Sequence, residues 1–364
     1  MRSLFPVLIL LSMTVAKSQT VEKDVEHVKV YYEKGRYGGW PANHGIWIWG
    51  NEILVGFLKG YYEDRGPKRH NMSETKTQVT ALARSLDGGQ TWTMENTEGR
   101  LDFPDCGTAM NFTHPDFALT VRRKEWTSGI FHSYDRGKTW SGPCALPGFG
   151  TPGVAGRTDY IVNSSNEALL FLTAAKSNGE EGRVIAVKTV DGGKSWSLLS
   201  SIGPEPEDYT IMPATVRLSD TELLSTVRTK EGPQTILEAY HSNDNGVTWT
   251  RRSIAVHDTG VGNPPAMIKL KDGRICLVYG FRAEEEEIRN NTKTSDIRAR
   301  LSSDNGTTWS REYILRNDAS GRDIGYPRVV QRADGKIVAL YYFMDKITGS
   351  ERYIAATIWT PPVM

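Results

Sequence analysis

Two arginines stand at the same place in two separate apolar runs of the chain. Arg228 follows Leu223 to Val227, and Arg282 closes the corresponding later run. A guanidinium group meets a carboxylate through two parallel hydrogen bonds, so such arginines suit a carboxylate-bearing ligand. His44 and His114 precede other apolar runs, and a His/Tyr pair can remove and return a proton next to a carboxylate. These residue types point to acid–base chemistry on an acidic ligand if the fold brings them together.

A short pattern recurs five times and defines the elements that must position these residues. Its form is Ser/Thr-X-Asp-X-Gly-X-Thr/Ser-Trp, called an Asp-box below. Asp-X-Gly favours a hairpin turn, because the Asp carboxylate accepts hydrogen bonds from backbone amides within the turn and Gly tolerates a positive φ. The Trp begins the next strand and can pack over the hairpin. We therefore predict that the five aspartates are structural and not catalytic. The copies are Ser85–Trp92, Ser133–Trp140, Thr189–Trp196, Ser242–Trp249 and Ser302–Trp309.

Pairs of apolar runs that meet at a polar turn lie between the Asp-boxes, as from Tyr326 to Phe343. Each unit reads strand, turn, strand, loop, strand, Asp-box, strand, which is the pattern of a propeller blade. Five boxes mark five blades. The last pair and a strand near Tyr353 to Trp359 make a sixth blade that lacks one strand. We predict that Val28 to Tyr32 supplies it. The expected fold is an all-β, six-bladed β-propeller that forms a single domain over residues 22–364.

The path of the chain through a blade predicts which residues share a face. The first strand of each blade leaves that face and the second returns to it, while the Asp-box turn lies at the opposite end. The starts of the first strands contribute Asn43, His44, His114, Asp116, Arg157, Asp159, Tyr160, Tyr209, Met212, Asn263, Asp323 and Tyr326. The ends of the second strands contribute Lys59, Lys176, Arg228, Arg282 and Tyr342. A long polar loop from Tyr61 to His70 covers the same face. A ligand site is expected there, and a structural salt network is the alternative.

The N-terminus has the features of a signal peptide over residues 1–18. Arg2 supplies the positive charge, Phe5 to Val15 is apolar, and Ala16 and Ser18 are small residues before a cleavage site at Gln19. The apolar run is too short to span a bilayer. We therefore expect a secreted or periplasmic protein without membrane insertion.

Charge and cysteine usage narrow the possible partners. The 44 Lys and Arg residues balance 43 Asp and Glu residues, so no overall field favours nucleic acid. The three cysteines Cys106, Cys144 and Cys276 exclude a complete disulfide framework and fit no zinc pattern. One bridge between Cys106 and Cys144 remains open. No motif calls for a metal or an organic cofactor.

Repeated Asp-boxes on a six-bladed propeller resemble the sialidase (neuraminidase) superfamily, and the resemblance covers nearly the whole mature chain. The segment Asp323-Ile324-Gly325-Tyr326-Pro327 is similar to the family's nucleophile segment, which implies that Tyr326 is the nucleophile. The run that ends at Arg228 resembles a segment with a substrate-binding arginine, and Arg282 can serve as a second. A tyrosine suits an anionic anomeric centre better than a carboxylate, which the charge of the substrate would repel.

Three positions depart from the pattern of this family. The segment from Trp40 to Gly45 stands where the family has its first arginine, and Met212 stands where it keeps the glutamate that activates the tyrosine. The acid/base aspartate has no clear counterpart. The candidate carboxylates in place of the glutamate are Asp208 and Glu238, and those in place of the aspartate are Asp64 and Glu74. The remaining candidates are Trp40, Arg157, Asp159 and His114 as sugar contacts and His44 as a catalytic residue.

The leading hypothesis is a secreted glycoside hydrolase that removes a terminal sialic acid or related acidic sugar, with a glycan as the partner. Tyr326 would be the nucleophile, Asp64 the acid/base, and Arg228 and Arg282 the carboxylate clamp. A second hypothesis is a polysaccharide lyase or uronate-glycan hydrolase that uses His44 and His114 with a tyrosine. A third is a propeller that binds glycans without cleaving them. The oligomeric state stays open.

Overall fold

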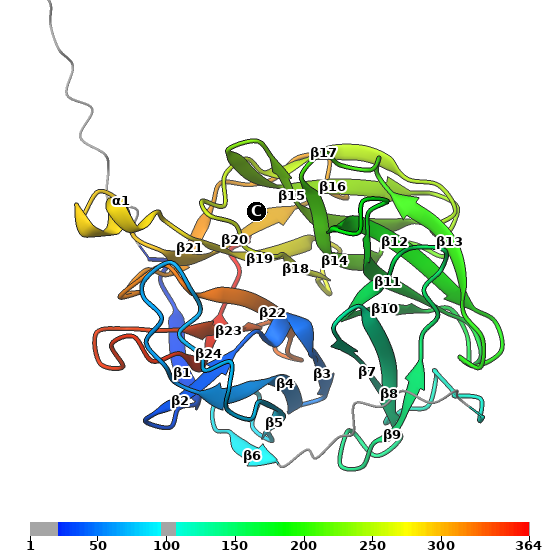
Figure 1. Cartoon of the computed structure of the whole chain (residues 1–364), viewed down its shortest axis with the longest axis horizontal. Coiled ribbons are helices and arrows are strands. Elements are labelled where there is room, and N and C mark those ends of the chain that lie inside the picture. Colours follow the sequence, from blue (N-terminus) through cyan, green and yellow to red (C-terminus); the bar gives the residue numbers. More distant parts are fainter. Residues whose placement is uncertain (1–20, 96–106, 364) are drawn as a thin grey trace, which may run out of the picture.

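Six antiparallel sheets surround a central axis, which confirms the all-β, six-bladed propeller. The computed structural model describes residues 21–95 and 107–363, so the predicted signal peptide lies outside the described residues. The sheets follow one another around the ring in chain order (Figure 1). Among the described residues, no helix combines the length and apolar character needed to cross a membrane.

Three blades have four strands in simple consecutive order. Blade three is formed by β10 (Val154–Val162), β11 (Ala168–Ala175), β12 (Glu181–Thr189) and β13 (Ser197–Ile202). Blade four is formed by β14 (Tyr209–Arg217), β15 (Leu223–Glu231), β16 (Gln234–Ser242) and β17 (Thr250–Val256). Blade five is formed by β18 (Ala266–Lys269), β19 (Ile275–Phe281), β20 (Asp296–Ser302) and β21 (Tyr313–Arg316), with the short helix α1 (Glu285–Arg289) between β19 and β20.

Blade six closes the ring in the way that the sequence predicts. The N-terminal strand pairs antiparallel with the last strand of the chain, from Val25 opposite Trp359 to Tyr31 opposite Ile354. This pairing gives the last blade its fourth strand and joins the two ends of the chain. The strands are β1 (Val25–Tyr31), β22 (Gly325–Gln331), β23 (Ile337–Phe343) and β24 (Tyr353–Trp359).

Blade one has an interrupted inner strand. Two short strands, β2 and β3, pair with the two halves of β4, and the one-turn helix η1 separates them. Trp40 precedes this turn in a left-handed conformation with φ of 56°. The interruption places the Trp40 to His44 segment at the axis. The elements are β2 (Arg36–Gly39), η1 (Pro41–Asn43), β3 (Gly45–Trp49), β4 (Glu52–Tyr61), β5 (Val79–Ser85) and β6 (Thr93–Glu95).

Blade two has three strands among the described residues, where the sequence predicts four. In the described part of the chain it contains β7 (Ala118–Lys124), β8 (Thr127–Ser133) and β9 (Ser141–Ala145). Its Asp-box joins β8 to β9, so β7 is the second strand and starts at the Asp-box end. The backbone carbonyl of Asp116 accordingly accepts the amide of Arg136 in that box at 3.0 Å. The residues before β7 therefore lie at the end of the propeller opposite to the one predicted.

The Asp-box hairpins have the predicted hydrogen bonds. In the first, Asp87 accepts the amides of Gln90 and Thr91 at 3.0 and 2.9 Å, and the Ser85 hydroxyl accepts the amide of Gly89 at 2.7 Å. The indole of Trp92 donates to the Gly89 carbonyl at 2.9 Å. All of these partners come from one eight-residue segment, so each box folds on local interactions.

Three inner strands contain a β-bulge. The register shifts lie between Gly156 and Tyr160 in β10, between Ile211 and Ala214 in β14, and between Gly325 and Arg328 in β22. A bulge re-aims the side chains of its extra residues. These bulges hold Arg157, Met212 and Tyr326, which the sequence placed at the starts of first strands.

One cysteine is bonded and one is not. Cys144 is disulfide-bonded, whereas Cys276 is a free thiol inside blade five. Cys106, the partner that the sequence offers for Cys144, lies outside the described residues.

Candidate active site

Tyr326 is held in a strained conformation at the start of the sixth blade. Its φ of 50° lies in the left-handed region, which is uncommon for a bulky residue. Asn263 from blade five holds this conformation, because its side chain accepts the Tyr326 amide at 2.9 Å and donates to the Ile324 carbonyl at 2.8 Å. A Cβ on Gly325 would approach the Asn263 side chain to 2.2 Å, so glycine is required there.

Three guanidinium groups surround the Tyr326 phenol. They belong to Arg157 in the β10 bulge, Arg228 in β15 and Arg282 directly after β19. Burial alone would raise the pKa of the Tyr326 phenol, but the charges of these arginines outweigh it and bring the pKa below its ordinary value of 10. Within the described residues, the Tyr326 hydroxyl makes no hydrogen bond. The site therefore stabilises the phenolate of Tyr326 more than water stabilises that of a free tyrosine, and the hydroxyl oxygen is available to a ligand.

The three arginines are fixed by different partners. Arg157 donates from Nε to the Asn43 side chain at 2.9 Å, and Arg228 donates from Nη2 to the Tyr209 hydroxyl at 2.9 Å. Arg282 donates from Nε to the Ile324 carbonyl at 2.9 Å, and its Cζ lies 5.2 Å from the centre of the Tyr326 ring.

Arg228 differs from Arg282 in its counterion. Arg282 lies 3.4 Å from a carboxylate oxygen of Asp323. No carboxylate in the described ranges pairs with Arg228, and its Nε is buried without a partner. A buried cation without a counterion is costly unless an anion is bound there. Arg228 is therefore the strongest candidate for contact with an acidic ligand.

The position of the family's activating glutamate is apolar here. Met212 adopts φ of 55° in its bulge and packs with Ala42 and Ile211 near Tyr326. Neither predicted substitute contacts the phenol. Glu238 pairs with Arg251 at 2.6 Å, and Asp208 accepts the Gly232 amide at 2.9 Å. The charged side chains that lower the pKa of the phenol are therefore arginines.

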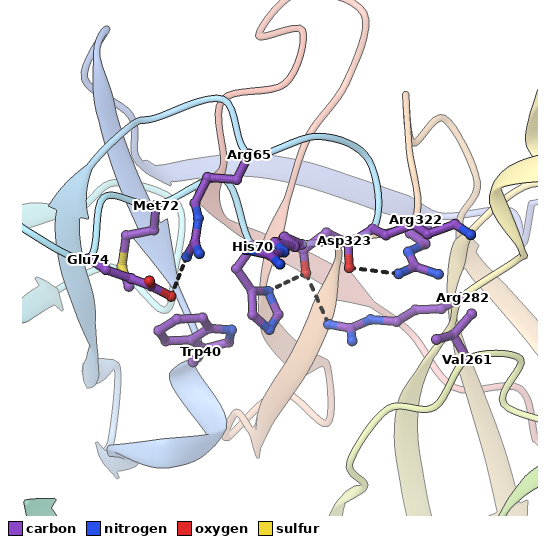
Figure 2. Close-up of a pocket in the computed structure, with 11 residues that line it drawn as sticks. Trp40, Arg65, His70, Met72, Glu74, Val261, Arg282, Arg322 and Asp323 are labelled. Atoms are coloured by element: carbon purple, nitrogen blue, oxygen red, sulfur yellow. Dashed lines mark hydrogen bonds and ion pairs between the residues drawn. The ribbon is translucent and has the colours of Figure 1, made fainter. Parts of the chain in front are cut away.

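A cavity of about 420 Å³ opens beside this cluster, between the long loop of blade one and blades five and six. Figure 2 shows that His70 and Arg282 both reach the Asp323 carboxylate, with Trp40 next to the His70 ring. A cavity of this size can hold a monosaccharide. Its lining residues are Trp40, Arg65, Lys68, Arg69, His70, Met72, Glu74, Val261, Arg282, Arg322 and Asp323.

None of the three predicted catalytic residues lines this cavity, and Tyr326 lies next to it, against the lining residue Arg282. Asp64 is exposed in the loop, where it accepts the Gly66 amide at 2.9 Å. His44 is buried under η1, and burial, with Arg122 and Arg328, lowers the pKa of its imidazole to about 3. His44 is thus neutral at physiological pH. Glu74 does line the cavity, but its exposed carboxylate is paired with Arg65.

Two predicted sugar contacts also lie elsewhere. The expectation that His114 shares a face with Tyr326 is wrong, because β7, the first described strand of blade two, starts at the Asp-box end. The centre of the His114 ring lies 5.1 Å from that of Tyr134 in the Asp-box of this blade. Asp159 faces a separate cavity on the axis that Arg328 also lines. There it accepts the Thr215 hydroxyl at 2.9 Å, and burial raises its pKa to about 7. Of the remaining candidates, Trp40 and Arg282 line the first cavity. Arg157 and Arg228 do not line it, but their charges act on the Tyr326 phenol.

The contact between His70 and Asp323 was missed in the sequence. Both residues were placed on the correct face, but nothing in either segment signals a partner 253 residues away. The only available signal was their shared face, which depends on closure of the ring.

The fold and the site define a six-bladed propeller of the sialidase-like kind, with a tyrosine inside an arginine cluster. The chain matches the family model described as a BNR repeat-like domain over residues 117–339. It therefore belongs to the family of proteins with a BNR repeat-like domain. No curated protein matches the chain.

Solved structures share the fold at low sequence identity. A protein of unknown function from Dyadobacter fermentans has a TM-score of 0.71 at 19% identity, covering 93% of this chain and 99% of its own. The Trypanosoma rangeli sialidase, solved in complex with sialic acid, has a TM-score of 0.59 at 13% identity, covering 93% and 59%. An α-L-arabinofuranosidase from Fusarium graminearum has a TM-score of 0.54 at 12% identity, covering 90% and 97%. At these identities the likeness shows the six-bladed propeller fold alone.

Proposed function

We propose that the protein is a glycoside hydrolase that releases a terminal acidic sugar, sialic acid or a close relative, from a glycan. The observation that carries this proposal is the convergence of Arg157, Arg228 and Arg282 on Tyr326. A ligand carboxylate would supply the negative charge that Arg228 lacks. The predicted signal peptide adds the proposal that the enzyme acts outside the cytoplasm.

The same cluster suits a tyrosine nucleophile. In the first step, the phenolate oxygen of Tyr326 attacks the anomeric carbon, the glycosidic C–O bond breaks, and the departing oxygen takes a proton from a general acid. In the second step, water displaces Tyr326, loses a proton to the same group and leaves the free sugar. Because the guanidinium charges stabilise the phenolate, the first step does not need the glutamate that Met212 replaces.

The lyase hypothesis loses its motivating residues. His44 is buried and neutral, and His114 lies at the Asp-box end. A glycan-binding protein without activity is compatible with the fold, but binding alone gives no reason for a phenol with a lowered pKa.

The test is a product assay on the purified mature chain. Sialylated glycans and uronate glycans are incubated with the protein, and products are identified by mass. The proposal predicts a saturated, free acidic monosaccharide from chain ends. An unsaturated uronate product would establish a lyase, and saturable binding without any product would establish a binding protein.

A further inference from the structure

At the wall of the cavity, the partly exposed side chain of His70 is hydrogen-bonded to the buried side chain of Asp323. Nδ1 of His70 lies 2.8 Å from Oδ1 of Asp323. The His70 ring also meets the Trp40 ring edge-on, with 4.9 Å between ring centres. Asp323 is only 6% exposed, whereas 41% of the His70 side chain is exposed. The pair therefore presents an imidazole to the cavity and keeps its carboxylate inside the protein.

Asp323 is held as a carboxylate. Burial alone would raise its pKa, but His70, Arg352 and Arg282 hold that pKa well below the ordinary range. The hydroxyl of Tyr342 donates to the same oxygen as His70, and Nε of Arg352 donates to the other oxygen at 3.1 Å. A fixed negative charge at this point can only accept a hydrogen bond, so it selects the His70 tautomer with a proton on Nδ1.

This orientation leaves Nε2 of His70 free to exchange a proton with a ligand. Nε2 lies on the side of the ring away from the carboxylate, and no described residue hydrogen-bonds it. Nε2 can donate a hydrogen bond to a ligand atom when it carries a proton and can accept one when it does not. An imidazole held by a buried carboxylate is a common arrangement for a group that gives and takes one proton.

The pair is also close to the proposed nucleophile. Asp323 precedes Tyr326 by three residues, and Arg282 contacts both of them. The rings of Tyr326 and Tyr342 pack with 5.9 Å between centres. His70 thus reaches the site from the long loop, while Tyr326 reaches it from the inner strand of blade six.

We propose that His70 is the acid/base of the reaction and that Asp323 is its positioning residue. This inference rests on the proposed function. In the first step the Nε2 proton passes to the departing glycosidic oxygen as the Tyr326 oxygen bonds the anomeric carbon. The products are a glycosyl-tyrosine, an alcohol and a neutral imidazole. In the second step Nε2 takes a proton from water as the water oxygen displaces Tyr326, which restores the imidazolium and the phenolate.

The rival carboxylates are less well placed for this task. The Asp64 carboxylate binds the backbone of its own loop and does not line the cavity. Glu74 does line it, but Arg65 lowers the pKa of its carboxyl, which makes it a poor proton donor near neutral pH. His70 is therefore the group in the described loop that combines access to the cavity with a fixed partner.

The test compares leaving groups in His70→Gln, with Asp64→Asn as the matched variant from the same loop. Two substrates with one acidic sugar are used, an alkyl glycoside whose oxygen needs a proton and a nitrophenyl glycoside whose oxygen does not. We expect kcat/KM of His70→Gln to fall about 10²- to 10⁴-fold on the alkyl glycoside and less than about tenfold on the nitrophenyl glycoside. Azide should raise kcat of His70→Gln on the nitrophenyl glycoside and yield a glycosyl azide. Because His70 lies in an exposed loop, the variant is expected to fold.

Three outcomes overturn this assignment in distinguishable ways. An equal loss on both substrates would make His70 a binding or structural residue. A loss that depends on the leaving group in Asp64→Asn, but not in His70→Gln, would transfer the role to Asp64. If the folded wild-type protein hydrolyses neither substrate, the proposed function fails, and this inference fails with it.

Discussion

The two ends of the propeller use carboxylates in opposite ways. At the Asp-box end, Asp87 is bound by residues within four positions of it, and those hydrogen bonds lower its pKa to about 2 although burial opposes them. At the other end, the partners of Asp323 lie between 19 and 253 residues away. Local partners make a folding unit that is complete within a single blade. Distant partners make a site that exists only when the ring is complete.

The largest effect on activity is expected from Tyr326→Phe, at the end of the propeller opposite the Asp-boxes. This variant removes one hydroxyl that bonds no described residue, so thermal stability should change little. Loss of the nucleophile should lower kcat/KM on a sialylated substrate by at least about 10³-fold. Steady-state kinetics and a melting curve test both parts. Unchanged turnover would remove Tyr326 from the mechanism.

A smaller loss is expected from Arg228→Lys. Lysine keeps the charge but loses the planar fork that binds a carboxylate, so KM should rise and kcat/KM should fall about 10²-fold. The matched control is Arg217→Lys at the other end of the same blade, where Arg217 bonds Asn245 at 2.9 Å. Its kcat/KM should stay within about twofold of wild type. Equal losses in both variants would mean that Arg228 acts through the fold.

The reverse pattern is expected from Asp87→Ala. The variant loses the hydrogen bonds of one hairpin, which are worth about 1–2 kcal/mol in total, so the melting temperature should fall by about 2–4 °C. The activity of the folded protein should not change. Calorimetry and kinetics on the same sample check this, and a loss of kcat without a change in stability would contradict a purely structural role.

The smallest expected effect is on the pH dependence of the free energy of unfolding. The pKa values of Asp87, Asp135 and Asp191 lie at about 2, below the ordinary 3.8. A lowered pKa stabilises the folded state above pH 4, and this contribution is lost as the pH falls through 2. Asp87→Asn should thus be less stable than wild type at pH 7, with a difference that shrinks between pH 4 and pH 2. Urea unfolding at several pH values measures this; a constant difference down to pH 2 would refute it.

The same comparison explains how much the sequence could predict. Each Asp-box carries its own hydrogen-bond donors and acceptors, so five hairpins and the fold could be read from local patterns. Closure of the ring by Val28 to Tyr32 followed because the sixth blade was one strand short.

The site was less predictable, because the end of the propeller at which a residue lies depends on the number of strands in its blade. Blade two has three described strands, and that one difference moves His114 to the Asp-box end. Arg157, Arg228 and Tyr326 lie in blades with four strands, and they meet as expected. The pairing of His70 with Asp323 depends on how a long loop folds over another blade, which no local pattern encodes.

The central claim is that Tyr326 attacks the anomeric carbon and is then displaced by water. Two displacements at one carbon retain its configuration, whereas direct attack by water inverts it. Proton NMR during the first minutes of hydrolysis identifies the anomer that forms before mutarotation. The account predicts that the first sugar released has the same anomeric configuration as the substrate, and release of the inverted anomer would contradict it.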